Sequence, residues 1–528
     1  MNVEAYQEAL EHSPLQVSAA RGLACRGAVI AAGFYLLLTL ALLASVLRET
    51  HGILVYTLDD PYIHMAIAKN LVLHGIYGVT SHGFTSASSS ILWPFLLAAV
   101  YKLIGTSVAA PFVLQIVIAI GIIWLAWHIL KKDGITSSSY AICVLCALVF
   151  FVPMVPLTFV AMEHLLHVLA TLLLGMITVD YLQNHRANLL PVLCCAAAVS
   201  LVRYEGAFLV ASVALLFLFE RRFLDAVLIG IAGALPIVSW GMYSLSRGGM
   251  FLPNSILIKK QPAGIDSLAR LLRLATDCPE LFVLALAALL LLVFVRGMEV
   301  RDRRFLKLFL CSTFFHALFA SYGWFFRYEA YLICFGWVAV AATGWKILSC
   351  LPDRSIAALA LLVLCSPLFN RGFTAIQQTP QASAHVYHQQ YQMAMFIRDY
   401  YSNSRIEIND IGAICFYSDP YITDLGGLGD MDIVRVRIHP GQVESLQALA
   451  ARSAPEIALV YASWYGFDNT PPRGWIKTGT WNDPEQVILG QNVVTFYGVG
   501  SENAARLRSN LAMFHSQLPE ELADYATP

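Results

Sequence analysis

Long apolar runs dominate this chain and restrict its fold more than any other feature. Most approach the roughly 20 residues that a helix needs to cross a bilayer. They lie at about 28–48, 108–130, 138–156, 163–182, 188–203, 206–220, 222–246, 277–296, 304–322, 328–349 and 354–369. Of the 528 residues, 58% are hydrophobic and 13% charged, about half the charged share of a soluble domain. The sequence predicts a polytopic α-helical membrane protein with about 11–13 transmembrane helices.

Charge and cysteine content narrow the class further. The net charge is −1 and no long Lys/Arg run occurs, so we expect no nucleic-acid partner. The 11 cysteines have neither disulfide nor zinc spacing. The polar stretch before the first run has no small-residue cleavage pattern, which predicts a cytoplasmic segment at 1–27 followed by an uncleaved anchor.

The positions of Lys and Arg predict the orientation of the transmembrane domain, 28–369. If each run crosses once, one side carries the basic residues and is the cytoplasm: Arg21, Arg26, Lys131, Lys132, Arg186, Arg221, Arg222, Arg296, Arg301, Arg303, Arg304 and Lys307. The first loop (49–90) and everything after residue 370 then face outside. Residues 91–104 are apolar but too short to span comfortably, so we interpret them as re-entrant or interfacial; if they cross, another run does not.

The composition changes near residue 370. Polar stretches alternate there with short β-rich runs, which predicts an outer α/β domain at 370–528. These runs are "RIEINDIGAICFYS", "DIVRVRI", "EIALVYAS" and "VVTFYGV".

The first outer loop places two adjacent acids, Asp59 and Asp60, before a predicted helix in "TLDDPYIHMAIAKN". Asp60 suits the N-cap, Pro61 the first helical position and Gly75 the end, and we expect this helix to lie along the membrane surface. Asp60 therefore has a structural explanation. Asp59 lies near the positive end of the helix dipole, which favours its ionised form. It is the stronger candidate for a base that takes the proton from a hydroxyl, although a solvated loop acid is the alternative.

Further polar residues on the outer side are candidate substrate ligands, each with a structural alternative. Glu163 and His164 could simply begin a helix, Arg203 and Glu205 could form an ion pair, and the cations could anchor to lipid headgroups. Converging with carboxylates, the cations suggest a phosphate clamp. The candidates are His64, His82, Thr85, Glu163, His164, Arg203, Glu205, Asn254, Lys259, Lys260, Arg327, Tyr328, Asp410 and Tyr417.

One reaction accounts for these candidate residues together. Outward-facing cations and a hydrophobic body would hold a lipid-linked phosphosugar, while a carboxylate activates an acceptor hydroxyl. No glycine-rich nucleotide loop is evident, so a nucleotide-sugar donor has no obvious site.

Several segments together resemble the GT-C superfamily of membrane glycosyltransferases, in its bacterial arabinofuranosyltransferase-like branch. They are "LDDPYIHMAIAKNL", "GFTSASSSILWPFLLA", "AMEHLLHVLATLLL", "VRYEGAFL", "LPNSILIKK", "RYEAYL" and "INDIGAICFYSDPYITDLGGLG". The resemblance covers about residues 25–430. It implies a GT-C-like fold and inverting transfer of a sugar from polyprenyl phosphate to an envelope glycan, lipid or protein at the outer face of a bacterial inner membrane.

The resemblance also implies roles for individual residues. Asp59 would be the catalytic aspartate, Asp60 its accompanying acid and Glu163 a second acid of the site. Lys260 and Arg327 would bind phosphate, and the segment with Asp410 and Tyr417 would help to bind acceptor. Some relatives use a divalent metal, which Asp59, Asp60 and Glu163 could hold. The chain has "RYEG" where many relatives have Arg-Pro-Glu-Gly, so arabinose is not carried over.

Two other classes of protein remain open. A transporter or flippase would line a translocation path with intramembrane charges. Here the charges gather at one outer rim, which favours the enzyme. A binding or assembly subunit with a degenerate catalytic loop would show no turnover with any donor.

Overall fold

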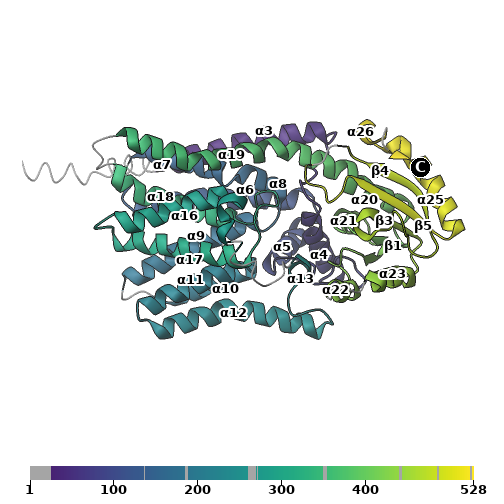
Figure 1. Cartoon of the computed structure of the whole chain (residues 1–528), viewed down its shortest axis with the longest axis horizontal. Helices are drawn as coiled ribbons and strands as arrows, with labels where there is room; N and C mark the ends of the chain where they lie inside the picture. The colour runs from purple at the N-terminus through teal and green to yellow at the C-terminus, as the bar shows by residue number, and fades with distance from the viewer. Residues whose placement is uncertain are drawn as a thin grey trace, which may run out of the picture.

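A computed structural model describes residues 25–135, 137–184, 188–259, 269, 271–348, 354–438, 443–484, 487–523 and 526–527. The chain forms a helical bundle and a C-terminal α/β domain, with α4, α5 and α13 between them (Figure 1). The elements up to α13 are α3 (Arg26–Glu49), α4 (Asp60–His74), α5 (Leu92–Ile104), α6 (Ala109–Lys132), α7 (Ser138–Phe151), α8 (Met154–Val160), α9 (His164–Gln183), α10 (Leu190–Val202), α11 (Gly206–Phe219), α12 (Phe223–Ser246) and α13 (Asn254–Lys259). The remaining helices of the bundle are α15 (Leu274–Asp277), α16 (Pro279–Phe294), α17 (Val300–Phe319), α18 (Ala330–Leu348) and α19 (Arg354–Val386).

The apolar runs form helices, as expected. By length and composition, five spans among the described residues could cross a membrane: α3, α6, α7 with α8, α9 and α12. The helix predicted at 91–104 is α5, which has 13 residues and packs on α4 and α6.

Charged side chains gather at two opposite ends of the bundle. At the end away from the C-terminal domain, Lys132 pairs with Asp180 at 2.6 Å, and Arg301 pairs with Asp180 at 2.6 Å and with Asp133. Arg304 pairs with Glu220 at 2.9 Å. Arg301 is only 6% exposed, so these pairs fix where α6, α9 and α17 meet. Of the basic residues expected to share one side, Lys132, Arg301 and Arg304 thus lie together, whereas Arg21 and Arg186 lie outside the described residues.

The C-terminal domain is built on one mixed sheet of six strands in the order β2-β1-β3-β5-β4-β6. Strands β1, β2 and β3 are parallel, and β5, β4 and β6 join as antiparallel strands. The strands are β1 (Arg405–Ile408), β2 (Tyr421–Asp424), β3 (Ile457–Val460), β4 (Trp475–Asn482), β5 (Val493–Val499) and β6 (Ala526–Thr527). The other elements are η1 (Tyr387–Tyr391), α20 (Gln392–Tyr400), α21 (Gly412–Tyr417), α22 (Met431–Ile438), α23 (Val443–Arg452), α24 (Ala462–Tyr465), α25 (Ser501–Phe514), η2 (His515–Gln517) and α26 (Glu520–Ala523).

The expected strand "DIVRVRI" is wrong, because this segment is helix α22. Asp430 accepts hydrogen bonds from the N–H groups of Asp432 and Ile433, and Asp432 pairs with Arg435 one turn later. Capping and this pair outweigh the β-propensity of the alternating valines and isoleucine.

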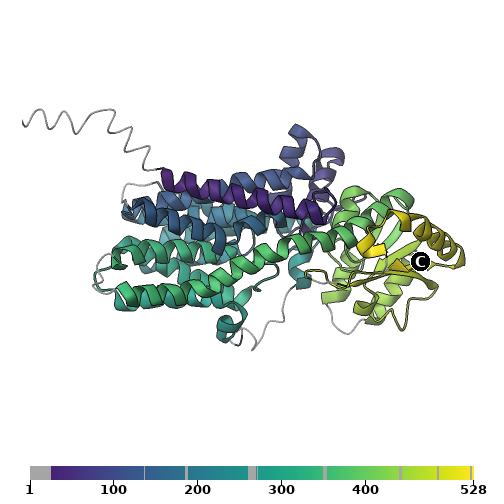
Figure 2. The same cartoon turned by 90° about the horizontal axis from the view of Figure 1, so that it is seen from above.

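Helix α19 joins the two parts of the molecule. It continues through residue 370, where composition alone placed the domain boundary, and extends into the C-terminal domain (Figure 2). The π-helical turn η1 follows directly.

Helix α4 is covered on nearly all sides, and its buried residues include Tyr62, His64 and Met65. Its contacts with α5 and α21 explain this burial, so it does not lie alone on a membrane surface. The helix ends at Gly75 in the left-handed conformation, as predicted. At its start the prediction is wrong: Asp59 is the N-cap residue, Asp60 is helical, and no side chain caps the helix.

Candidate active site

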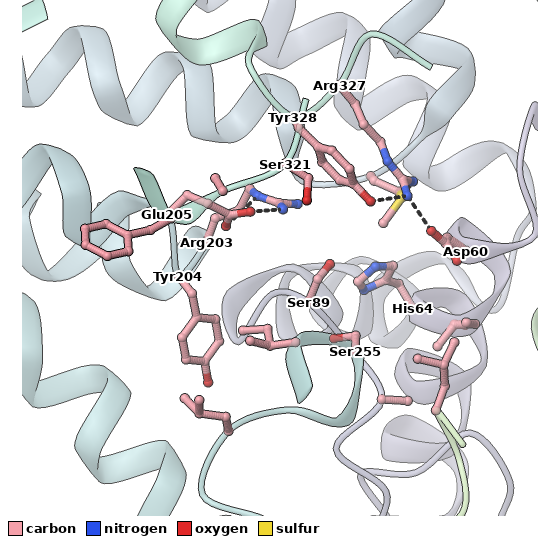
Figure 3. A pocket seen from close by; sticks show the side chains of 18 of the residues that line it. Asp60, His64, Ser89, Arg203, Tyr204, Glu205, Ser255, Ser321, Arg327 and Tyr328 are labelled. Carbon is pink, nitrogen blue, oxygen red and sulfur yellow. Dashed lines mark hydrogen bonds and ion pairs between the residues drawn. The ribbon is translucent and has the colours of Figure 1, made fainter. Parts of the chain in front are cut away.

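A cavity of about 410 Å³ lies where the bundle meets the C-terminal domain. Asp60 and His64 of α4, the α10–α11 junction, α13 and the α17–α18 loop line it, and Leu428 comes from the C-terminal domain. Figure 3 shows polar side chains from these separate elements pointing toward one another. Apolar side chains complete the wall: Ile63, Met162, Phe208, Leu252, Ile256 and Phe319.

Asp60 and Arg327 form an ion pair on this wall. The Arg327 Nη2 atom lies 2.6 Å from Asp60 Oδ2 (Figure 3). Arg327 is 2% exposed, and its Nε makes no hydrogen bond to the described residues. The Asp60 side chain is 22% exposed. The pair therefore presents a reachable carboxylate beside a buried guanidinium that retains donor capacity.

Arg203 is neutralised more completely than Arg327. It bonds to both oxygens of Glu205, at 3.2 and 2.7 Å, and also to Glu163. Its Nη1 donates to His164 Nε2 at 2.8 Å. Tyr328 lies between the two arginines, with its ring centroid 5.2 Å from the Arg327 guanidinium and 5.9 Å from that of Arg203 (Figure 3). The ion pair predicted for Arg203 and Glu205 thus exists.

Glu163 is fully buried beneath the cavity. It accepts a hydrogen bond from Ser89 Oγ at 2.9 Å, and its Oε2 lies 3.6 Å from His64 Nε2. Burial lowers the pKa of His64, against the opposite effect of Glu163 and Asp60. Because the other ring nitrogen of His64 bonds to Ser88 at 3.0 Å, this imidazole is oriented by protein groups on both sides. Glu163 and His64 therefore help to hold Arg203 and α4 in place.

Asp59 points away from the cavity, toward the C-terminal domain. Its two oxygens accept hydrogen bonds from the backbone N–H groups of Gly412, at 2.7 Å, and Ala413, at 2.8 Å. A Cβ atom at Gly412 would lie 2.1 Å from the Asp59 carbonyl oxygen, so only glycine permits this approach. Burial and the nearby Asp410 raise the pKa of Asp59 to about 8, although the two N–H donors act against that shift. Asp59 fastens the C-terminal domain to the start of α4.

Asp410 belongs to the same junction. It follows β1, and its Oδ2 accepts hydrogen bonds from Tyr461 Oη at 2.6 Å and from Gln390 Nε2 at 2.8 Å. Burial raises its pKa. Gln390 comes from η1 and Tyr461 follows β3, so the carboxyl ends of the parallel strands face the bundle. In open α/β sheets this edge is where ligands usually bind.

A strained backbone segment presents Arg327 and Tyr328. Gly323, Trp324, Phe325 and Phe326 have successive φ values of 75, 44, 62 and 59°. The left-handed region costs L-residues about 1–2 kcal/mol each. Such strain persists only where surrounding contacts enforce it, and it is enriched at functional sites.

The structure brings Asp60, His64, Arg203, Glu205, Arg327 and Tyr328 to the cavity, with Glu163 and His164 directly behind Arg203. Other predicted ligands lie elsewhere. His82 stacks on Tyr421 at 3.8 Å, and Thr85 Oγ1 accepts from the Val79 N–H within its own loop. Tyr417 packs against Tyr62 and Tyr391, and Asn254 donates to the Leu428 carbonyl. Lys260 and the side chain of Lys259 lie outside the described residues.

Sequence reasoning missed Ser89, Tyr204, Ser255, Ser321 and Leu428, which also line the cavity. Ser89, Tyr204, Ser255 and Leu428 lie inside segments quoted above, and Ser321 lies six residues before Arg327. Only Tyr204 adjoins charged residues, and serines are too common in loops to be singled out.

The three acids considered for a metal do not converge. Asp59 bonds to backbone N–H groups, Asp60 to Arg327, and Glu163 to Arg203 and Ser89. Within the part of the chain that the structure describes, no group of three His, Cys, Asp or Glu side chains has metal-ligand geometry. These residues therefore do not fit a divalent ion in this arrangement.

Comparison with known proteins identifies the fold. A family model described as "Domain of unknown function (DUF8728)" matches residues 381–497. No curated protein matches the chain. The structure of ArnT from Cupriavidus metallidurans bound to undecaprenyl phosphate is similar, with a TM-score of 0.51 and 11% identity over 89% of this chain and 99% of that one. The apo form of that protein gives a TM-score of 0.48, also at 11% identity, over 89% of this chain and 98% of that one. The expected architecture, a helical bundle with a C-terminal sheet domain, is thus confirmed, and its fold is similar to that of ArnT.

Proposed function

We propose that this protein is an inverting membrane glycosyltransferase that moves a sugar from a polyprenyl-phosphate donor to an acceptor hydroxyl. The observation that carries this proposal is the cavity with the Asp60–Arg327 pair on one wall and apolar side chains on the rest. The fold shared with an undecaprenyl-phosphate-bound protein supports the same class of donor.

The apolar wall suits a lipid-linked substrate. Phe319 lines the cavity and is also 62% exposed on the outside of the bundle. A lipid chain could therefore lie against the bundle while its phosphate reaches the polar wall. A guanidinium is the preferred ligand for such a phosphate.

Arg327 is the better phosphate ligand of the two arginines. Arg203 already bonds to two carboxylates, whereas Arg327 pairs with Asp60 alone among the acids of the cavity wall. A phosphate oxygen on Arg327 would place the anomeric carbon beside Asp60. In this proposal Arg203 shapes the wall and leaves the phosphate to Arg327.

The reaction needs one base. Asp60 accepts the proton of the acceptor hydroxyl while that oxygen attacks the anomeric carbon. The bond between the anomeric carbon and the phosphate oxygen breaks, and the electron pair leaves with the polyprenyl phosphate. Arg327 stabilises the charge that develops on the departing phosphate. Attack opposite the leaving group inverts the configuration.

Asp60 is a better candidate for this base than Asp59. Asp60 lines the cavity, whereas both oxygens of Asp59 are bonded to the backbone of α21. Asp59 therefore acts here as the anchor that positions Asp60.

The test is Asp60→Asn in purified protein supplied with an undecaprenyl-phosphate sugar and an acceptor. We expect a fall in kcat of about 10²–10⁴-fold, as for loss of a general base. Asp225→Asn is the matched control, because Asp225 is 23% exposed and pairs with Arg222 at the opposite end of the bundle. Near-normal transfer by Asp60→Asn would refute the assignment.

A transporter is distinguished by a second assay. Protein in sealed liposomes should form a glycosidic bond on the side that its cavity faces. Movement of substrate across the bilayer without a new bond would favour the transporter. We also propose that the cavity faces the periplasm across a bacterial inner membrane. The basic residues at the opposite end of the bundle support this, because such residues favour the cytoplasmic side.

The sugar and the acceptor can be identified in cells. Mass spectrometry of envelope glycans, lipids and glycoproteins from a strain lacking the protein should show the loss of one sugar from one class of acceptor. An unchanged envelope would contradict a role in envelope glycosylation.

A further inference from the structure

Arg371, in the middle of α19, holds the strained loop that carries Arg327. Its Nη2 donates to the Phe326 carbonyl at 2.5 Å, and its guanidinium lies 5.4 Å from the Phe326 ring centroid. Its Nη1 pairs with Glu329 and lies 3.6 Å from Glu280 Oε1. One side chain thus contacts the residue before Arg327 and pairs with the acid two residues after it.

Glu329 closes the loop from its other end. Its Oε2 accepts the N–H of Gly323 at 2.8 Å, while Oε1 pairs with Arg371. The two side chains are 1% and 2% exposed. They therefore join the first left-handed residue, Gly323, to the last, Phe326, inside the protein.

A buried ion cluster of this kind is a poor device for stability alone. Desolvation offsets most of the attraction, and well-packed apolar side chains of similar size often serve as well or better. Apolar side chains, however, cannot accept the Gly323 N–H or donate to the Phe326 carbonyl. The contacts made here specify a conformation of the loop.

We propose that Arg371 is a positioning residue that acts through Arg327: with Glu329 it holds the left-handed turn at 323–326, and this turn aims Arg327 at Asp60 and at the donor phosphate. The inference rests on the proposed function. It also gives α19 a second role, because the helix that contributes Arg371 continues into the domain that anchors Asp59.

The test combines Arg371→Met, Arg371→Lys and Glu329→Gln with a matched control. Arg301→Met removes an equally buried arginine from the ion cluster at the far end of the bundle. Hydrogen exchange should rise at 320–329 in the first three variants and stay unchanged there in Arg301→Met. No increase in Arg371→Met would overturn the proposal, and this readout requires no turnover.

Binding of undecaprenyl phosphate gives the functional readout. We expect Arg371→Met to weaken it at least tenfold per folded molecule and Arg371→Lys to restore part of the loss, while Arg301→Met binds normally. In the background of Arg327→Met, Arg371→Met should add no further loss, since it acts through Arg327. Fully additive losses would overturn the proposal.

The proposed function and the proposed role of Arg371 can be refuted independently. If the wild-type protein does not bind undecaprenyl phosphate, the proposed function fails, whereas the hydrogen-exchange result still reports on the loop. If Arg371→Met does not fold, Glu329→Gln provides the same comparison, because it can keep an acceptor for Gly323 while it turns an NH2 group toward Arg371 and so breaks their ion pair.

Discussion

Replacing Asp59 by asparagine separates docking of the C-terminal domain from the chemistry of the cavity. Asparagine keeps one acceptor oxygen but turns an NH2 group toward the second backbone N–H, which then lacks a partner. A buried donor left unsatisfied costs about 1–3 kcal/mol. We therefore expect Asp59→Asn to destabilise the protein by about that amount, and to lower kcat far less than the 10²–10⁴-fold expected for Asp60→Asn.

Gly412→Ala provides an independent route to the same junction. The added Cβ would lie 2.1 Å from the Asp59 carbonyl oxygen and 2.8 Å from its carboxyl carbon, so α21 must move away from α4. If Asp59 is an anchor, this variant should reproduce the stability loss and the modest activity loss of Asp59→Asn.

The assays are thermal unfolding in detergent and steady-state transfer from an undecaprenyl-phosphate sugar, measured for the three variants in parallel. One result would refute the reasoning: Asp59→Asn abolishing turnover with normal unfolding, while Asp60→Asn stays active. Asp59 would then be the base, as the family resemblance alone implies.

Three other expectations concern charge and packing. Burial raises the pKa of Glu407 to about 8 and that of Asp424 to about 7, so the folded domain keeps protons that the unfolded chain releases near pH 4. The stability of the domain should therefore fall as the pH rises from about 4 to about 8, and it should fall less steeply in Glu407→Gln. A thermal-unfolding profile that is flat over this range would contradict this. Arg203→Met leaves Glu163 buried without its main partner and should cost about 3–5 kcal/mol in unfolding free energy, against less than about 1 kcal/mol for the half-exposed Arg398→Met. Asp60→Asn should bind undecaprenyl phosphate more tightly than wild type in equilibrium binding, because it removes a negative charge 2.6 Å from Arg327; weaker binding would argue against a phosphate on Arg327.

The helical bundle and the charged residues around the cavity were predictable because each depends on local composition. A run of about 20 apolar residues specifies a helix by itself. Charges interrupting such runs must find partners, which is why Arg203, Glu205 and Arg327 could be singled out. These residues gather around one cavity because loops separated by an even number of crossings lie on the same side of the bundle.

The different surroundings of Asp59 and Asp60 could not be predicted in the same way. Their order at the start of α4 suggested that Asp60 caps the helix and that Asp59 is the catalytic base. In the structure both oxygens of Asp59 are bonded to backbone N–H groups more than 350 residues away, in a domain whose packing leaves no local trace. Arg371 escaped notice for a related reason: it follows the last apolar run and meets Glu329 only in the fold.

The charged side chains around the cavity are not balanced. Three acids, Asp60, Glu163 and Glu205, face two arginines, Arg203 and Arg327, so the described side chains alone disfavour the binding of an anionic donor. Helix α13 brings Ser255 and Ile256 to the cavity wall and ends at Lys259, and Lys260 follows it. A phosphate approaching Arg327 needs at least one further cation to offset Asp60, and these two lysines are the nearest in sequence to the wall. Phosphate binding by Lys260 therefore stays a prediction, now motivated by charge balance as well as by resemblance.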